Sequence, residues 1–350
     1  MADYDYDIGI IGGGAAGLTV ASGSAQLGAK TILFEKEKEL GGDCLHFGCV
    51  PSKTLIKSAH VYHLMKNSDR FGLPKVDLPP PDFKAISNRI RSVIGTIQKH
   101  DSEERFCSLG AKIMFGQPFF TDEHTVRLDG KAHTAKNWVI ASGSSPVSPP
   151  IKGLDCTAHI TNKEIFYLDH LPESMIVLGA GPIGCEMSQA FNRLGTRVEV
   201  VDMAPQILPR EDPEMAGSVQ SVMEDEGVRF HLNAKITETT DKGARKEVKI
   251  TNPDGKVVTL SAEMLLVALG RAANIDQLGL EGIGVEYERR GIAVDNRLRT
   301  NHRHIYAAGD CNGGFQFTHA AGYEGGIVVS NAIFHLPRKT DYTYLPWCTY

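Results

Sequence analysis

The feature that most constrains the fold of this chain is a glycine pattern that occurs twice, at an offset of 167 residues. The two G-x-G-x-x-G segments consist of Gly12, Gly14 and Gly17, and of Gly179, Gly181 and Gly184. Gly28 and Gly195 keep the same offset, as do the acids Glu35 and Asp202. One such pattern is common in ordinary turns. Two copies, each with a matched acid, predict two dinucleotide-binding βαβ units.

The residues around each glycine pattern have the order strand, turn, helix and strand. Four short apolar runs are typical of buried strands, at residues 7–11, 31–34, 175–178 and 198–201. Between them, residues 15–27 and 183–194 have the apolar spacing of helices. In such a unit the glycines let a pyrophosphate approach the helix N-terminus, and the acid accepts hydrogen bonds from the ribose. A solvated carboxylate at a strand end is the alternative interpretation of each acid.

The second acid also bears on which nicotinamide nucleotide is bound. A carboxylate at Asp202 favours a free ribose 2′-hydroxyl and repels a 2′-phosphate. The next residues, Met203, Ala204 and Pro205, include no arginine, and Arg210 lies eight residues after Asp202. The sequence therefore favours NAD over NADP.

Two cysteines, Cys44 and Cys49, are separated by four residues and followed by Pro51 and Lys53. Pro51 suits the first turn of a helix, which would place the Cys49 sulfur near the positive end of the helix dipole. Positive charge and a helix N-terminus lower the pKa of a thiol and make it reactive. Two buried, inert cysteines are the alternative, and a metal site has only His46 as a further ligand between them.

The composition excludes several classes of function. The 350 residues carry a net charge of −5 without a dense Lys/Arg stripe, so we expect neither nucleic acid nor an anionic membrane surface as a partner. No apolar run is long enough for a transmembrane helix. The seven cysteines are odd in number and scattered, which favours a reducing, cytoplasmic location over a secreted disulfide framework.

The remaining segments complete an α/β pattern. Residues 87–109 have the spacing of one long amphipathic helix, and residues 111–135 contain short β-like runs typical of hairpins. The proline-rich residues 73–81 predict a surface loop, and residues 252–255 predict a hairpin turn. Prolines at 146–150 mark a crossing between two domains.

Four further segments resemble the flavoprotein disulfide reductases, which include dihydrolipoyl dehydrogenase, glutathione reductase and mercuric reductase. Residues 41–53 resemble the redox-disulfide segment of that family, and residues 306–310 resemble its second FAD motif. Residues 139–144 resemble its Ala-Thr-Gly turn, with Ser142 in place of threonine. Residues 268–274 resemble its Gly-Arg-x-Pro-Asn turn, with Ala273 where proline is usual.

The resemblance implies two Rossmann-like domains of the three-layer ββα type, the first of them discontinuous. Residues 1–149 and 276–350 would bind FAD, and residues 150–275 would bind NAD. The residues expected to hold FAD are Gly12, Gly14, Gly17 and Glu35 at its ADP half and Asp310 on its ribityl side. Those expected to hold NAD are Gly179, Gly181, Gly184 and Asp202. Seven further residues are expected to bind a cofactor: Ala16, Gly42, Ser142, Gly143, Gly270, Arg271 and Gly309.

The resemblance also assigns catalytic roles. Cys49 corresponds to the thiolate next to the flavin, and Cys44 to the interchange thiol that meets the substrate. Lys53 resembles the lysine beside flavin N5, and Glu186 its ion-pair partner near the nicotinamide. Each of these two would otherwise be a solvated surface residue. Electrons would pass between NADH, flavin and the Cys44–Cys49 disulfide, without a resident metal.

Within this class, a dihydrolipoyl dehydrogenase-like enzyme acting on a disulfide or dithiol is the first expectation. A mercuric-reductase-like enzyme is the second, and an FAD- and NAD-binding scaffold without redox activity is an alternative of another class. The family normally continues into a C-terminal domain that forms a homodimer and supplies a His–Glu pair. The sequence suggests a truncation before that domain, with a homodimer expected for the full-length protein.

Overall fold

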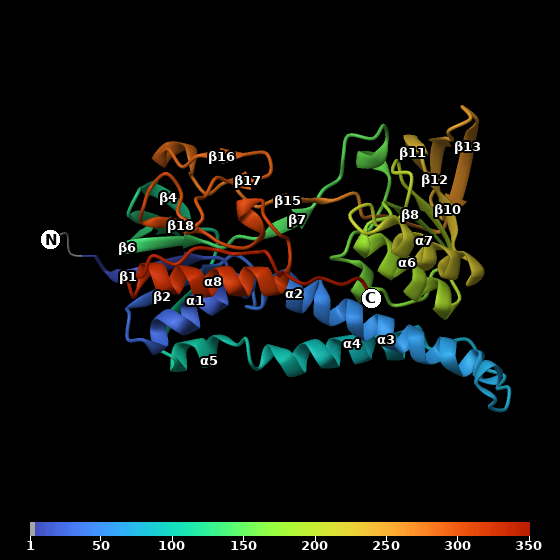
Figure 1. Ribbon diagram of the computed structural model, residues 1–350, viewed down its shortest axis with the longest axis horizontal. Coiled ribbons are helices and arrows are strands. Elements are labelled where there is room, and N and C mark those ends of the chain that lie inside the picture. Colours follow the sequence, from blue (N-terminus) through green and yellow to red (C-terminus); the bar gives the residue numbers. More distant parts are fainter. Residues whose placement is uncertain (1–3) are drawn as a thin grey trace. The chain divides into compact units, whose positions relative to one another are not determined.

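The structure is a computed structural model that describes residues 4–350, and it divides into two compact units (Figure 1). Unit 1 contains the chain up to residue 46 together with residues 95–145 and 271–348, and unit 2 contains residues 47–94, 146–270 and 349–350. The predicted domain division assigned residues 47–94 to the FAD-binding part. That division concerns cofactor binding and stays a prediction.

Unit 1 is built on a parallel sheet. Its strands lie in the order β3 (Ala111–Phe115), β2 (Thr31–Glu35), β1 (Tyr6–Ile11), β6 (Lys131–Ile140) and β18 (Ile305–Ala307). The first half of β6 continues into an antiparallel ribbon with β5 (Thr125–Leu128) and β4 (Phe119–Asp122). The hairpins predicted within residues 111–135 are confirmed.

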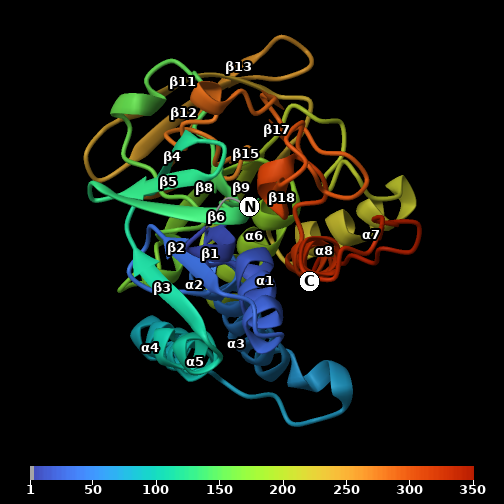
Figure 2. The ribbon, with the colours of Figure 1, turned by 90° about the vertical axis from the view of Figure 1, so that its left-hand side faces the viewer.

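Helices cover one face of this sheet, and the antiparallel strands and loops cover the other. Helix α1 (Ala15–Gln26) packs along α8 (Thr318–Ala332), as Figures 1 and 2 show. The opposite face buries apolar side chains, which include the aromatic residues Phe34, Phe120 and Trp138. The three layers confirm the predicted Rossmann-like class of fold, because the sheet buries apolar residues on both faces.

Unit 2 repeats this plan with a smaller sheet. Its parallel strands lie in the order β10 (Arg229–His231), β9 (Arg197–Val201), β8 (Ser174–Leu178) and β14 (Met264–Val267). An antiparallel meander of β11 (Lys235–Asp241), β12 (Lys246–Thr251) and β13 (Val257–Ala262) shares an apolar core with them. The turn predicted at residues 252–255 joins β12 to β13 and is confirmed.

The helices of unit 2 include α6 (Pro182–Leu194), α7 (Pro213–Asp225) and α3 (Cys49–Lys66), and α3 packs against α6.

Helix α2 (Gly42–His46) precedes α3, and α4 (Phe83–Gln98) and α5 (Glu103–Ser108) follow it. The shorter strands are β7 (Ser144–Pro146), β15 (Arg271–Ala273), β16 (Tyr287–Glu288) and β17 (Gly291–Ile292). Single 3₁₀ turns occur at Ser68–Phe71, Leu154–Cys156, Ile165–Tyr167, Glu281–Ile283 and Asp310–Asn312.

The prediction of one helix over residues 87–109 is wrong. The chain leaves α4 after Gln98 through a turn, and α5 begins at Glu103. The Ser102 hydroxyl accepts a hydrogen bond from the Arg105 backbone N–H at 3.3 Å, so Ser102 caps a new helix. The apolar spacing continues across the break because both helices bury side chains, among them Ile94 and Phe106.

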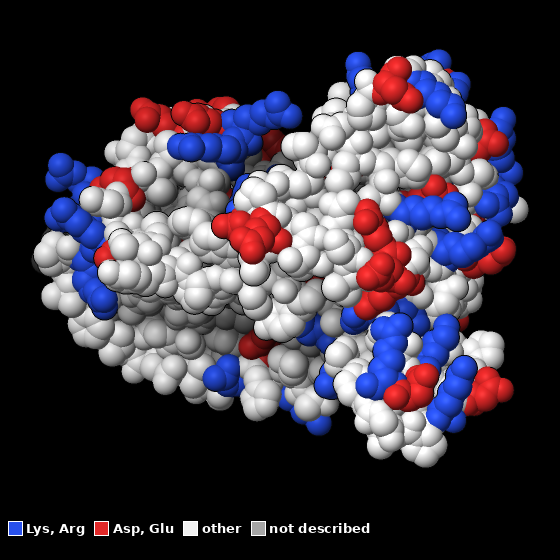
Figure 3. Space-filling view, turned by 45° about the vertical axis from the view of Figure 1, so that its right-hand side comes forward, with Lys and Arg blue, Asp and Glu red and all other residues white. Residues whose placement is uncertain are grey.

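The charged surface is mixed. On the face in Figure 3, groups of Lys and Arg side chains lie next to groups of Asp and Glu, so charges of opposite sign offset each other at short range. Within residues 4–350, no helix combines the length and the hydropathy needed to cross a bilayer.

Candidate functional site

The first glycine turn joins β1 to α1 and leaves no room for side chains. Gly12 has a φ of +108°, and a Cβ on it would lie 2.3 Å from the Ala141 carbonyl oxygen. A Cβ on Gly17 would lie 1.8 Å from the carbonyl oxygen of Gly12. Ala16, which stands between these glycines, is buried. The turn therefore brings the start of α1 directly against the end of β1.

The second glycine turn has the same construction. Gly179 has a φ of +105°, and a Cβ on it would lie 2.4 Å from the Ala268 carbonyl oxygen. A Cβ on Gly184 would lie 1.9 Å from the carbonyl oxygen of Gly179. Glycine at these positions is required by the close packing of helix on turn in both copies.

The two matched acids make matched hydrogen bonds. The Glu35 carboxylate accepts from the backbone N–H of Gly13 at 2.6 Å and of Glu37 at 2.8 Å. The Asp202 carboxylate accepts from the backbone N–H of Ala180 at 2.6 Å and of Ala204 at 2.7 Å. Each acid thus ties the end of its strand to its glycine turn. The sequence indicated a carboxylate for ribose but not this second use.

Both helices that follow the glycine turns begin without a side-chain cap. Gly14 occupies the N-cap position of α1 and Gly181 that of α6, and neither first turn contains an acidic residue. The first backbone N–H groups of a helix have no partner within the helix, and the helix dipole is positive at this end. The two ends therefore suit an anion such as a pyrophosphate.

A polar network surrounds Asp310 in unit 1. The Ser144 hydroxyl donates to the Asp310 carboxylate at 2.5 Å and accepts from Arg271 Nε at 2.8 Å. The guanidinium of Arg271 also pairs with the Asp43 carboxylate at 3.1 Å. Burial raises the pKa of Asp310, while the Ser144 hydrogen bond and the Arg271 charge oppose the rise. The sequence singled out Asp310 and Arg271 and missed Ser144 and Asp43 as their links.

The predicted turn at residues 142–143 is closed by a reciprocal pair of hydrogen bonds. The Ser142 hydroxyl donates to the Asn274 carbonyl at 2.6 Å, and Asn274 Nδ2 donates to the Ser142 carbonyl at 2.8 Å. Gly143, with a φ of +70°, accepts from the Asn274 backbone N–H at 2.9 Å. Gly270 has a φ of +121° and accepts from the Val147 N–H at 3.1 Å.

The cysteine segment follows the first glycine turn closely. A Cβ on Gly42 would lie 2.7 Å from the Gly14 Cα, so the start of α2 touches the N-cap of α1. Cys44 is half-buried within α2. Cys49 is exposed and is the first residue of α3, as the sequence predicted from Pro51. The Cys49 sulfur is therefore placed at the positive end of a helix dipole.

Lys53 and Glu186 meet in unit 2. Lys53 Nζ donates to both carboxylate oxygens of Glu186, at 2.7 and 3.0 Å. The side chain of Glu186 is only 7% exposed, against 35% for Lys53. The Tyr350 backbone N–H also donates to Glu186 at 3.0 Å, and the Tyr350 ring centroid lies 4.9 Å from Lys53 Nζ. The structure thus brings two residues 133 positions apart into the contact expected from the sequence, and adds Tyr350.

Two other cysteines lie in the helix or turn that follows a cofactor motif, and both are buried. Burial raises the pKa of the Cys185 and Cys311 thiols to about 12. Such thiols are inert at neutral pH. Among residues 4–350, no group of three or more His, Cys, Asp or Glu side chains is arranged to hold a metal ion.

Comparison with known proteins gives consistent matches. A family model described as pyridine nucleotide-disulphide oxidoreductase matches residues 6–325. Dihydrolipoyl dehydrogenase of Bacillus subtilis (strain 168) is 35% identical, with 99% of this chain and 75% of that protein covered. Mercuric reductase of Bacillus cereus is 33% identical, with 99% of this chain and 55% of that protein covered.

A solved structure agrees with these matches. The HOCl-induced flavoprotein disulfide reductase RclA from Escherichia coli superimposes with a TM-score of 0.84 at 28% sequence identity. The match covers 96% of this chain and 73% of that one.

Proposed function

The chain belongs to the pyridine nucleotide-disulphide oxidoreductase family, and we propose that it exchanges electrons between NADH and the Cys44–Cys49 pair through bound FAD. The observation that carries this proposal is the pair of glycine turns, each with its acid hydrogen-bonded to the turn. When bound, FAD supplies the two-electron chemistry that links a nicotinamide to a disulfide.

The residues of unit 1 fit the ADP half of FAD. Gly14 and Gly42 approach each other closely without side chains, and α1 begins without a side-chain cap, so its first backbone N–H groups suit a pyrophosphate. Glu35 already accepts two backbone N–H bonds and retains lone pairs for the ribose hydroxyls. Asp310 would accept from the ribityl chain, held in place by Ser144. Residues 1–149 and 276–350 are proposed as the FAD-binding part.

Residues 150–275 are proposed to bind NAD at the turn of Gly179, Gly181 and Gly184. The Asp202 carboxylate would accept from the 2′-hydroxyl of the ribose and repel a 2′-phosphate. This supports NAD over NADP. Gly270 and Arg271 are proposed as further cofactor-binding residues, with Arg271 held by Ser144 and Asp43 in unit 1.

The Cys44–Cys49 pair is proposed as the redox disulfide. The position of Cys49 at the α3 N-terminus stabilises its thiolate, and Cys44 would attack the substrate. Lys53 and Glu186 would place a cation and a carboxylate beside the reacting rings. In the overall two-electron reaction, NADH and one proton reduce the disulfide to two thiols and yield NAD⁺.

The proposed substrate is a disulfide or dithiol of the dihydrolipoyl type, because Asp202 favours NAD. Reduction of mercuric ion is the second candidate, since one relative of 33% identity is named mercuric reductase. The chain spans 55% of that relative and 75% of the dihydrolipoyl dehydrogenase. Turnover of dihydrolipoamide with NAD⁺, compared with mercuric ion and NADH, separates the two.

We also propose a homodimer for the full-length protein and a cytoplasmic location. The seven scattered cysteines lack the spacing of a secreted disulfide framework. The molar mass of the full-length protein in solution, measured by light scattering, checks the dimer.

The test of function is an anaerobic titration of the FAD-reconstituted protein with NADH. Cysteines are alkylated before and after reduction and identified by mass spectrometry. One equivalent of NADH should release new thiols at Cys44 and Cys49 only, NADPH should do so at higher concentration, and Cys49→Ser should abolish the change. Oxidation of NADH without new thiols contradicts the disulfide role. Binding of both cofactors without NADH oxidation favours the passive scaffold.

A further inference from the structure

Unit 1 buries a carboxylate that is not among the site residues described above. Glu324 lies on α8 and is 1% exposed. Its Oε2 accepts from the Gly309 backbone N–H at 2.7 Å and from Asn312 Nδ2 at 2.8 Å, and its Oε1 accepts from the Tyr342 hydroxyl at 2.5 Å. A buried carboxylate is costly unless its oxygens are hydrogen-bonded, so this arrangement has to be kept intact in the folded protein.

The two donors on Oε2 enclose Asp310. Gly309 has a φ of +79°, and Asp310 to Asn312 form a single 3₁₀ turn after it. Asn312 is held at its other end as well, because its Oδ1 accepts from the Gly314 N–H at 2.9 Å. Glu324 therefore holds the residues on both sides of Asp310 and sets where the Asp310 carboxylate points.

Helix α8 is itself fixed against the first glycine turn. A Cβ on Gly325 would lie 2.9 Å from the Ala16 carbonyl oxygen and 3.0 Å from Thr19 Cβ. The helices α1 and α8 are in backbone contact at this point, so α8 cannot shift without opening the start of α1. Glu324, the neighbour of Gly325, is thus held in place relative to both predicted FAD motifs, the first glycine turn and residues 306–310.

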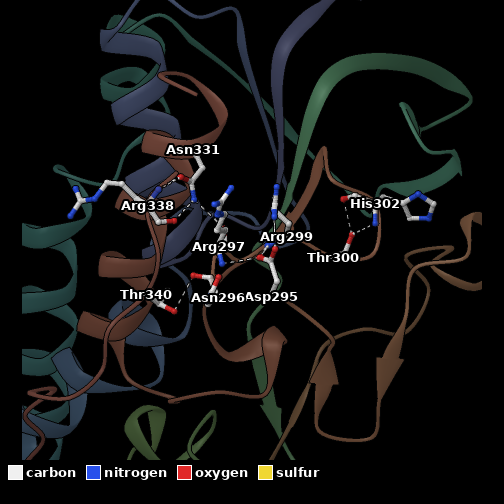
Figure 4. Close-up of polar contacts among 9 residues, drawn as sticks. All are labelled: Asp295, Asn296, Arg297, Arg299, Thr300, His302, Asn331, Arg338 and Thr340. Atoms are coloured by element: carbon white, nitrogen blue, oxygen red, sulfur yellow. Dashed lines mark hydrogen bonds and ion pairs between the residues drawn. The ribbon is translucent and has the colours of Figure 1, made fainter. Parts of the chain in front are cut away.

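The donor Tyr342 comes from a segment that is tied down on its own. Asn331 Oδ1 accepts from the Arg338 N–H at 2.9 Å, and Asn331 Nδ2 donates to the Arg338 carbonyl at 2.9 Å. The Thr340 N–H donates to the Asn296 carbonyl at 2.8 Å. Figure 4 shows these residues, with contacts between the Asn331 side chain and the Arg338 backbone and between the backbones of Thr340 and Asn296.

Aromatic contacts complete the placement of Tyr342. Its ring centroid lies 5.2 Å from that of Phe315 and 6.0 Å from that of Tyr323, the latter edge-on. The Tyr323 hydroxyl accepts from the Asp341 N–H at 2.9 Å. The hydroxyl of Tyr342 is therefore delivered to Glu324 by a preformed segment.

We propose that Glu324 is a positioning residue for the turn that would carry Asp310 to FAD, and that Tyr342 couples the segment at residues 338–342 to this turn. The inference rests on the proposed FAD site. Burial raises the pKa of Glu324, and the three donors oppose that rise. Burial and the nearby Glu324 raise the pKa of Tyr342.

The geometry predicts a distinctive order among variants. In Glu324→Gln, the amide oxygen can accept from both turn donors while the amide N–H donates to the Tyr342 oxygen, so FAD affinity should stay within about twofold. Glu324→Met leaves buried donors without acceptors and should weaken FAD binding by about tenfold to hundredfold. Tyr342→Phe should weaken binding less, and combined with Glu324→Gln it should weaken binding more than either change alone.

The experiment measures FAD affinity by reconstitution of the apoprotein and hydrogen exchange of the peptide that contains residues 309–314. Exchange in the FAD-free protein should be faster in Glu324→Met and Tyr342→Phe. Tyr344→Phe, which removes the hydroxyl of a side chain that is 92% exposed, should leave exchange of this peptide unchanged. Wild-type exchange and affinity in both Glu324→Met and Tyr342→Phe would overturn the proposal.

The exchange measurement also separates this proposal from the proposed function. If the wild-type protein fails to bind FAD, the FAD site is wrong, while the exchange of residues 309–314 in the variants still reports on Glu324. If Glu324→Met does not fold, Tyr342→Phe and the double variant decide, since both retain a polar side chain at position 324.

Discussion

Substitution of Gly184 by alanine tests the nucleotide turn most directly. The added Cβ would lie 1.9 Å from the Gly179 carbonyl oxygen and 3.0 Å from the Gly179 carbonyl carbon. The obstacle is backbone and not the end of a flexible side chain. Because contacts shorter than 3.0 Å do not occur for real Cβ atoms, α6 must move away from the turn by more than 1 Å.

The size of the effect can be worked out from this displacement. Overpacking of this kind costs about 1–3 kcal/mol. A tenfold change in affinity corresponds to about 1.4 kcal/mol. We expect the dissociation constant of NADH to rise by about tenfold to hundredfold in Gly184→Ala, with FAD binding unchanged. In Gly17→Ala the added Cβ would lie 1.8 Å from the Gly12 carbonyl oxygen. This variant should weaken FAD binding and leave NADH binding unchanged.

The assay is a fluorescence titration of FAD-loaded protein with NADH, together with the flavin absorbance and the melting temperature. Gly217→Ala in α7 is the matched control, because a Cβ there meets nothing within 4 Å. It should raise stability slightly, by about 0.5–1 kcal/mol. Wild-type NADH affinity in Gly184→Ala would refute the reasoning, as would equal loss of both cofactors in both glycine variants.

Three further changes have expected outcomes. Lys53→Met leaves the buried Glu186 carboxylate without its cation and should cost about 1–3 kcal/mol in urea unfolding, with most of the loss recovered in the double variant with Glu186→Gln. Iodoacetamide at pH 8 should label the exposed Cys49 in the reduced native protein but label Cys185 only after unfolding; mass spectrometry reads both. Because burial raises the pKa of Glu324, the folded protein holds a proton that the unfolded chain loses above the ordinary glutamate pKa. The stability of wild type relative to Glu324→Gln, measured by thermal unfolding, should therefore fall as pH rises from the ordinary glutamate pKa through the raised pKa of the folded protein. A stability difference that does not change with pH would contradict this.

Local pattern predicted the two βαβ units almost to the residue. The first strand was expected at residues 7–11 and spans Tyr6–Ile11, and the second helix was expected at 183–194 and spans Pro182–Leu194. These elements are specified by short-range signals, namely buried apolar runs and glycines that only a tight turn requires. The prediction of one helix over residues 87–109 was wrong for the opposite reason. The apolar spacing continues across a break in the helix, and the local signal for that break is the capping residue Ser102.

The contacts that complete the site could not be read from spacing. Ser144 meets Asp310 across 166 positions, and Tyr342 meets Glu324 across 18 positions without a shared helix. Such contacts between distant side chains are set by the tertiary packing, and the local hydrophobic pattern of the sequence does not indicate them. Gly9 gives a similar case: a Cβ there would lie 2.2 Å from the Trp138 ring, which the strand pattern alone does not reveal.

The two acids explain why one backbone plan can serve two different dinucleotides. In each copy a single carboxylate accepts from the residue after the first glycine and from the residue two positions beyond itself. The glycine turn and the strand end, which we propose to bind pyrophosphate and ribose, are thereby joined by hydrogen bonds. Under the proposed function, the residues after the acid set which nucleotide is bound. After Asp202 come Met203 and Ala204, without a cation for a phosphate, whereas Lys36 and Glu37 follow Glu35 and the first copy then continues to Gly42 and Cys44. The same hydrogen bonds thus fix the same backbone in both copies, and under the proposed function the residues that follow distinguish the turn for NAD from the turn for FAD beside the cysteines.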